Sequence, residues 1–114
     1  MMSFEQLLQT HCQPQVGHPL AAPDVRDQLA ELPEWQYKDG RIQRAFSFRG
    51  YFDTIAFVNA LAWVVHREDH HPDLGVHHNR CVVSFHTHSV GGISYNDFVC
   101  AAKVEALYAQ RPFV

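Results

Sequence analysis

Seven of the nine histidines in the chain fall between His66 and His88, in the stretch HREDHHPDLGVHHNRCVVSFHTH. Imidazole titrates near neutral pH, so such a cluster suits proton transfer, and neutral imidazole is also a common metal ligand. A metal site needs three or four convergent ligands, whereas acid–base chemistry needs only a pair of imidazoles at one pocket. The surrounding sequence has to decide between these two uses.

A metal site would have to draw on two pairs of histidines. His66 and His70 are four residues apart in a predicted helix and would share one helical face. His86 and His88 are two residues apart in a predicted strand and would also share a face. However, the acid in H-R-E-D-H does not stand where the zinc motif H-E-x-x-H requires it. We therefore expect no metal, and we expect His11, His18 and His66 to be solvated surface residues.

Acid–base chemistry would need imidazoles at two element ends that meet. The triplet His70-His71-Pro72 lies where a helix should end, because proline disfavours helical geometry in the residue before it. Thr87-His88 lies at the end of a predicted strand, before a loop that contains Gly91-Gly92. These ends could form a pocket of proton donors and acceptors. The residues alone leave open that they are only a polar helix end and a polar strand end.

Length and composition indicate one ordinary globular domain. The chain has 114 residues, of which 46% are apolar and 18% charged. The net charge is −3, so direct nucleic-acid binding is not expected. The N-terminus lacks the pattern of a secretory signal, no stretch is long enough to span a membrane, and free thiols fit a reducing compartment. We therefore expect a cytoplasmic protein whose cysteines, none in a C-x-x-C pair, are Cys12, Cys81 and Cys100.

The first half of the domain reads as helix, hairpin, helix. Pro23 and Pro33 bracket a helix of about two turns. Alternating residues on either side of Asp39-Gly40 predict a β-hairpin over residues 35–48. Apolar residues then recur at helical spacing from residue 52 until Pro72 ends the pattern.

The second half repeats the pattern of two strands and a helix. Alternation predicts strands near residues 74–76 and 81–86, and Ser94 with Asp97 three residues later predicts the start of the last helix. The order α-β-β-α-β-β-α indicates an α+β fold, a four-stranded antiparallel sheet with helices packed on one face. We expect a single domain over residues 23–114. Residues 1–22 form an irregular lead-in, in which SFEQLLQ could form a short helix capped by Ser3.

Two segments at a matched separation give the chain its resemblance to a known family. EDHHPDLGV and THSVGGISYNDFVCAAKVEAL closely resemble the two histidine motifs of the pterin-4a-carbinolamine dehydratases. LPEWQ and RAFSFRGYFDTIAFVNALA also look like the family's Trp-containing strand and Phe-rich segment, so the resemblance covers about residues 24–110. The chain departs from the pattern at Leu74, where an aromatic residue is frequent, and at His78, where tyrosine is usual.

The resemblance implies a hydro-lyase that removes water from 4a-hydroxytetrahydropterin to give quinonoid dihydropterin. This reaction recycles tetrahydropterin for aromatic amino acid hydroxylases and needs no metal or other cofactor. The family also implies a homodimer or homotetramer. An alternative that the resemblance leaves open is a non-catalytic dimerisation or transcriptional-coactivator-type binding protein.

The resemblance also implies roles for individual residues. His70 and His88 would be the leading general acid and base, and His71 would hold the pterin and assist proton handling. The pterin site would be lined in addition by Pro72, Thr87, Ser89 and Val90. Asp97 could orient an imidazole or could simply be a carboxylate at a helix start, and the sequence does not separate these two roles.

Overall fold

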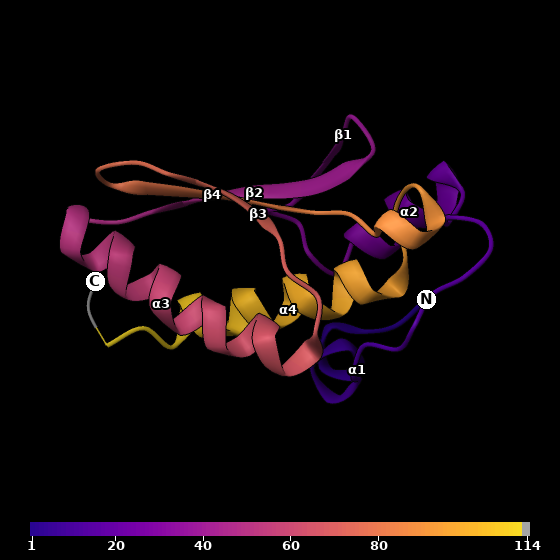
Figure 1. Cartoon of the computed structure of the whole chain (residues 1–114), viewed down its shortest axis with the longest axis horizontal. Coiled ribbons are helices and arrows are strands. Elements are labelled where there is room, and N and C mark those ends of the chain that lie inside the picture. Colours follow the sequence, from indigo (N-terminus) through magenta and orange to yellow (C-terminus); the bar gives the residue numbers. More distant parts are fainter. Residues whose placement is uncertain (113–114) are drawn as a thin grey trace.

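The computed structural model describes residues 1–112 and contains one antiparallel sheet of four strands in the order β1-β2-β4-β3. Helices α3 (Tyr51–Glu68) and α4 (Tyr95–Ala109) lie beneath one face of this sheet (Figure 1). The predicted α+β fold with helices on one face is therefore confirmed. The strands are β1 (Gln36–Lys38), β2 (Arg41–Ser47), β3 (Asp73–Val76) and β4 (Arg80–Phe85).

The turn between β1 and β2 is the predicted Asp-Gly turn. Asp39 and Gly40 have φ values of 54° and 74°, and Lys38 pairs with Arg41 across them. Two successive residues with positive φ match the right-handed twist of a hairpin, and aspartate and glycine tolerate this conformation best. Local sequence alone is therefore enough to place this hairpin.

Helix α3 ends at Glu68, which agrees with the prediction that it ends before Pro72. Asp69 adopts a left-handed conformation with φ of 52°, and its N–H donates to the carbonyl of His66 at 3.1 Å. The chain turns there, so His70 leaves the helix while His66 stays on it as an exposed residue. The prediction that these two histidines share a helical face is wrong for this reason.

The hydrophobic core fills the space between the sheet and the two long helices. Phe46 of β2 is fully buried, with its ring centroid 5.0 Å from that of Phe57 and 6.0 Å from that of Trp35. The Trp35 indole N–H donates to Glu105 Oε1 of α4 at 2.9 Å, so its polar edge is satisfied while its ring is buried. The Trp35 ring also lies 6.0 Å from that of Phe85 of β4, so Trp35 links β4 to α4, and both elements carry residues of the site described below.

The N-terminal segment packs against the same core. Helix α1 (Phe4–Gln9) is the short helix that the sequence suggested, with Ser3 as its N-cap, so the lead-in is not irregular over residues 4–9. Leu7 is fully buried against the core. The N–H of Leu20 donates to the carbonyl of Ile93 at 2.8 Å, just before helix α2 (Ala22–Leu29). A helix this short is only marginally stable by itself, even with a cap. The burial of Leu7 against the core therefore supplies most of its stability.

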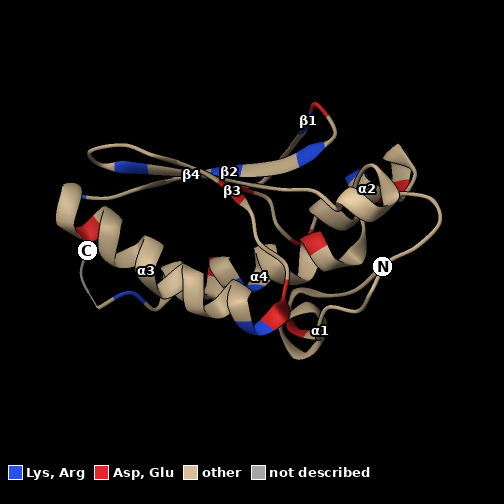
Figure 2. Ribbon diagram, viewed as in Figure 1, with Lys and Arg blue, Asp and Glu red and all other residues tan. Residues whose placement is uncertain are grey.

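Charged residues are interspersed over both layers of the fold. Figure 2 shows acidic and basic positions mixed along the sheet and the helices, in keeping with the small net charge of −3. Within residues 1–112, no helix combines the length and apolar character needed to cross a membrane.

Candidate active site

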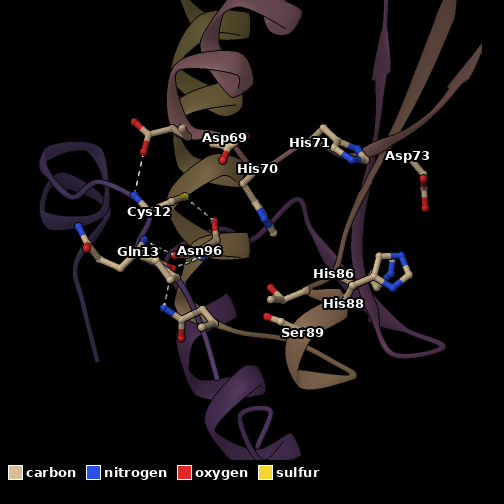
Figure 3. Close-up of a pocket in the computed structure, with 14 residues that line it drawn as sticks. Cys12, Gln13, Asp69, His70, His71, Asp73, His86, His88, Ser89 and Asn96 are labelled. Atoms are coloured by element: carbon tan, nitrogen blue, oxygen red, sulfur yellow. Dashed lines mark hydrogen bonds between the residues drawn. The ribbon is translucent and has the colours of Figure 1, made fainter. Parts of the chain in front are cut away.

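A pocket of about 470 Å³ opens where the end of α3, the end of β4 and the N-terminal segment meet. Figure 3 shows histidines on one side of it and the Cys12 region on the other. Three short segments, one residue of β3 and one residue of α4 line this pocket: residues 12–15, 68–71 and 86–89, Asp73, and Asn96.

His70 is fixed by a buried carboxylate. Its Nε2 lies 2.6 Å from Oδ1 of Asp97, whose side chain is completely buried, while the His70 side chain is 14% exposed. The imidazole also stacks on Phe85, with the two rings 11° from parallel. Because a carboxylate accepts hydrogen bonds, Nε2 carries the proton in this pair. The lone pair of neutral His70 is therefore on Nδ1, which makes no hydrogen bond to any residue in the described part of the chain.

The second oxygen of Asp97 caps helix α4. Oδ2 accepts from the backbone N–H of Ser94 at 2.9 Å and from the Thr87 hydroxyl at 2.8 Å. Asp97 therefore fills both roles that the sequence left open, one with each oxygen. Three donors compensate the burial of its charge, and they also fix the direction in which Oδ1 points at His70.

His71 and His88 are exposed residues of the pocket wall, in contrast to His70. In Figure 3, His71 lies beyond His70, and His88 lies with His86 below it. The rings of His86 and His88 are in contact, with centroids 4.6 Å apart. The pocket thus combines one oriented imidazole with solvent-accessible imidazoles that can exchange protons with water.

Arg41 connects the rim of the pocket to the sheet. Its Nη1 donates to Nδ1 of His86 at 3.1 Å and pairs with the carboxylate of Asp73. Burial and the positive charge of Arg41 lower the pKa of His86, and the hydrogen bond from Arg41 lowers the pKa of Asp73. His86 is therefore held neutral beside His88, with Nδ1 as the accepting nitrogen.

Five of the seven predicted site residues line the pocket, namely His70, His71, Thr87, His88 and Ser89. Thr87 is nearly buried, and its hydroxyl is occupied by Asp97 and Ser94. Pro72 faces a neighbouring hollow beside α3 instead, and Val90 is buried. The predicted contact of Pro72 and Val90 with a ligand stays a prediction.

The pocket wall formed by residues 12–15 was missed by the sequence reading. The backbone N–H of Cys12 donates to Glu68 Oε1 at 2.8 Å. The backbone of Gln13 exchanges two hydrogen bonds with the side-chain amide of Asn96, at 3.0 and 2.7 Å. No periodicity marks this segment, and its partners lie more than 50 positions away, so nothing in the local sequence could have placed it.

The histidines do not assemble into a metal site. In residues 1–112, no group of three or more histidine, cysteine, aspartate or glutamate side chains is arranged to hold an ion. The arrangement instead offers an oriented proton acceptor, accessible imidazoles and polar backbone groups around a space large enough for a small molecule.

Comparison with known proteins gives a consistent result. The model of the family "Pterin 4 alpha carbinolamine dehydratase" matches residues 18–107. The chain is 52% identical over 110 residues to a Stenotrophomonas maltophilia protein named "Putative pterin-4-alpha-carbinolamine dehydratase", covering 93% of this chain and 95% of that protein. A Chromobacterium violaceum protein of the same name is 50% identical over 107 residues, covering 93% of this chain and 98% of that protein.

A solved structure shares the fold over most of the chain. The crystal structure of a "transcriptional coactivator/pterin dehydratase" from Brucella melitensis superposes with a TM-score of 0.75 at 29% identity. The superposition covers 80% of this chain and 99% of the Brucella melitensis chain. The segment before residue 18, which forms one wall of the pocket here, lies outside the family match.

Proposed function

Because the chain belongs to the pterin 4 alpha carbinolamine dehydratase family, we propose that it removes water from 4a-hydroxytetrahydropterin by histidine acid–base catalysis. The product is quinonoid dihydropterin. The observation that carries the proposal is the hydrogen bond between His70 and the buried Asp97, which turns one imidazole into an oriented proton acceptor within a pocket lined by further imidazoles.

The elimination needs one acid and one base. The bond between C4a and the hydroxyl oxygen breaks, the N5–H bond breaks, and a C4a–N5 double bond forms. Hydroxide is a poor leaving group, so an acid must protonate it as it departs. In our assignment Nδ1 of His70 takes the N5 proton, and protonated His88 donates to the hydroxyl so that water leaves.

The surroundings of the two imidazoles support this division. When His70 takes a proton, its positive charge faces the Asp97 carboxylate 2.6 Å away, which stabilises the imidazolium. His88 is exposed, so it can regain a proton from water after each turnover. His71, also exposed on the pocket wall, is assigned to holding the pterin and assisting proton transfer.

The wider role is the one that membership of this family implies. A quinonoid dihydropterin is returned to use by a reductase, and a tetrahydropterin-dependent aromatic amino acid hydroxylase supplies the hydroxylated substrate. We propose this recycling role in the cytoplasm, as a homodimer or homotetramer. The Brucella melitensis structure is described as a coactivator as well as a dehydratase, so a binding role is the alternative to be tested.

The test is the dehydration of freshly generated 4a-hydroxytetrahydropterin, followed by its ultraviolet change. We expect wild type to accelerate it, and His71→Ala and His88→Ala to lose about 10²-fold or more of that acceleration. His66→Ala is the matched control, because His66 is exposed on α3 and does not line the pocket. If folded wild type gives only the spontaneous rate, the dehydratase proposal fails and the binding role gains support.

A further inference from the structure

Two thiols that the proposed dehydration does not use meet beside the pocket. Sγ of Cys12 lies 3.6 Å from Sγ of Cys100, although the residues are 88 positions apart in the sequence. Cys12 is half-buried and lines the pocket, whereas Cys100 is fully buried on α4. The residue that carries one of the two touching sulfurs therefore forms part of the pocket wall.

Hydrogen bonds on both sides of Cys12 hold the two sulfurs together. The Cys12 N–H is bound by Glu68 at 2.8 Å, and the next residue, Gln13, is bound twice by the side chain of Asn96. Asn96 and Cys100 are one helical turn apart on α4. The anchor of the N-terminal segment is thus next to the second thiol, and it keeps the sulfurs in contact.

The two sulfurs are in contact but are not at bonding distance. Sulfur atoms in a disulfide are about 2.05 Å apart, so the pair must approach by about 1.5 Å. In the reduced state, each sulfur is placed to donate weakly to a backbone carbonyl, Cys12 to that of Asn96 and Cys100 to that of His70, both at 3.6 Å. Neither contact is strong enough to oppose a rotation of the side chains.

We propose that Cys12 and Cys100 form an oxidation site for hydroperoxides, which closes to an intramolecular disulfide beside the pocket. This proposal rests on the contact between the two thiols and is independent of the dehydratase activity. The bond would tie the N-terminal wall of the pocket covalently to α4.

The oxidation balances in two steps. Sγ of Cys12 attacks one oxygen of hydrogen peroxide, the O–O bond breaks, and the hydroxide released leaves as water with the thiol proton. Sγ of Cys100 then attacks the sulfenic sulfur, the S–O bond breaks, and the hydroxyl leaves as water with the Cys100 proton. In total, two thiols lose two electrons and one peroxide is reduced to two molecules of water.

The environments of the cysteines explain the order of attack. The hydrogen bond with Cys12 and burial both raise the pKa of Cys100, so it is a poor first nucleophile for peroxide; it acts second because its sulfur already touches that of Cys12. Burial raises the pKa of Cys81 to about 11, which keeps this third thiol unreactive in the core. Cys12 is the least buried of the three cysteines and lies on the pocket wall, so we assign the first attack to it.

The test treats the reduced full-length protein with hydrogen peroxide, then denatures it and alkylates the remaining thiols. We expect wild type to lose two of its three alkylatable thiols and to yield a cross-linked peptide pair containing Cys12 and Cys100. Cys81→Ser should behave in the same way, and Cys12→Ser should form no intramolecular cross-link. Oxidised wild type should also show a higher Tm than the reduced form, because the bond closes a long loop in the unfolded chain.

Two results would overturn the proposal. One is three alkylatable thiols after peroxide treatment of folded protein. The other is oxidation of Cys12 to sulfinic acid while Cys100 remains alkylatable. Cys12→Ser is the variant of choice because Cys12 is half-buried, whereas Cys100 is fully buried, so replacing Cys12 is less of a risk to folding.

Discussion

Replacement of Asp97 by asparagine separates the charge of this residue from its role in the fold. Asparagine has nearly the same shape, and its single carbonyl oxygen can take the place of Oδ2, which accepts from Ser94 and Thr87 at 2.9 and 2.8 Å. The amide NH₂ then faces Nε2 of His70, which is 2.6 Å from Oδ1 in the native protein. Two N–H groups cannot face each other, so His70 must move its proton to Nδ1.

That change of tautomer removes the proton acceptor from the pocket. With Nδ1 protonated, neutral His70 can no longer take the N5 proton, and the carboxylate that would stabilise an imidazolium is gone. We expect Asp97→Asn to lower the dehydration rate by about 10²- to 10⁴-fold, the range that loss of a positioned base produces. Neutral hydrogen bonds are about half as strong as charge-assisted ones, so we also expect a loss of about 2 kcal/mol in stability.

The measurement combines the ultraviolet dehydration assay with thermal unfolding of both proteins. Asp53→Asn is the matched control, because Asp53 pairs with Arg49 at 3.1 Å in the first turn of α3, at the far end of that helix from His70. A folded Asp97→Asn protein with the wild-type rate would refute the reasoning. Equal losses of activity in both variants would also refute it, because they would show that the charge next to His70 has no particular role.

The remaining predictions concern the N-terminal wall. Glu68→Gln should destabilise the protein by about 1–3 kcal/mol at neutral pH, since the Glu68 side chain is only 5% exposed and accepts from Cys12 and His11. Burial raises the pKa of Glu68, but these donors and the positive charge of Lys103 outweigh burial and hold the pKa below its ordinary value. A carboxyl group whose pKa is lower in the folded than in the unfolded protein stabilises the fold at pH values above its unfolded pKa. This stabilisation is lost as the pH falls through the pKa of the folded state. The difference from wild type, measured by urea unfolding, should therefore shrink as pH falls below the ordinary glutamate pKa of about 4.3. Glu34 is exposed, so Glu34→Gln should show little effect at any pH. A difference that is constant down to pH 3 would contradict this. Gly92→Ala should cost about 1–3 kcal/mol in the same assay, because its new Cβ would lie 2.8 Å from Cβ of Pro19. Gly50→Ala, with open space around the added methyl group, is its control, and equal stability of the two variants would show that Pro19 does not pack there.

The sequence by itself determined the features that depend on neighbours along the chain. Asp39-Gly40 sets a tight turn because only a few residue types tolerate positive φ, and Ser94 with Asp97 starts α4 because an N-cap needs acceptors within one turn. The alternation along β4 places Val83 and Phe85 in the core. The two histidine motifs were equally readable, since each is a short contiguous pattern.

Tertiary structure decided what those motifs do together. The sequence could not choose between Asp97 as a cap and Asp97 as a partner of histidine, and packing of β4 against the helices allows both, one with each oxygen. The wall at Cys12 and the contact between Cys12 and Cys100 depend on groups 56 to 88 positions away. Such contacts form because burial of the apolar core brings distant elements together. The hydrophobic periodicity and the local propensities of a sequence do not indicate which distant groups will meet.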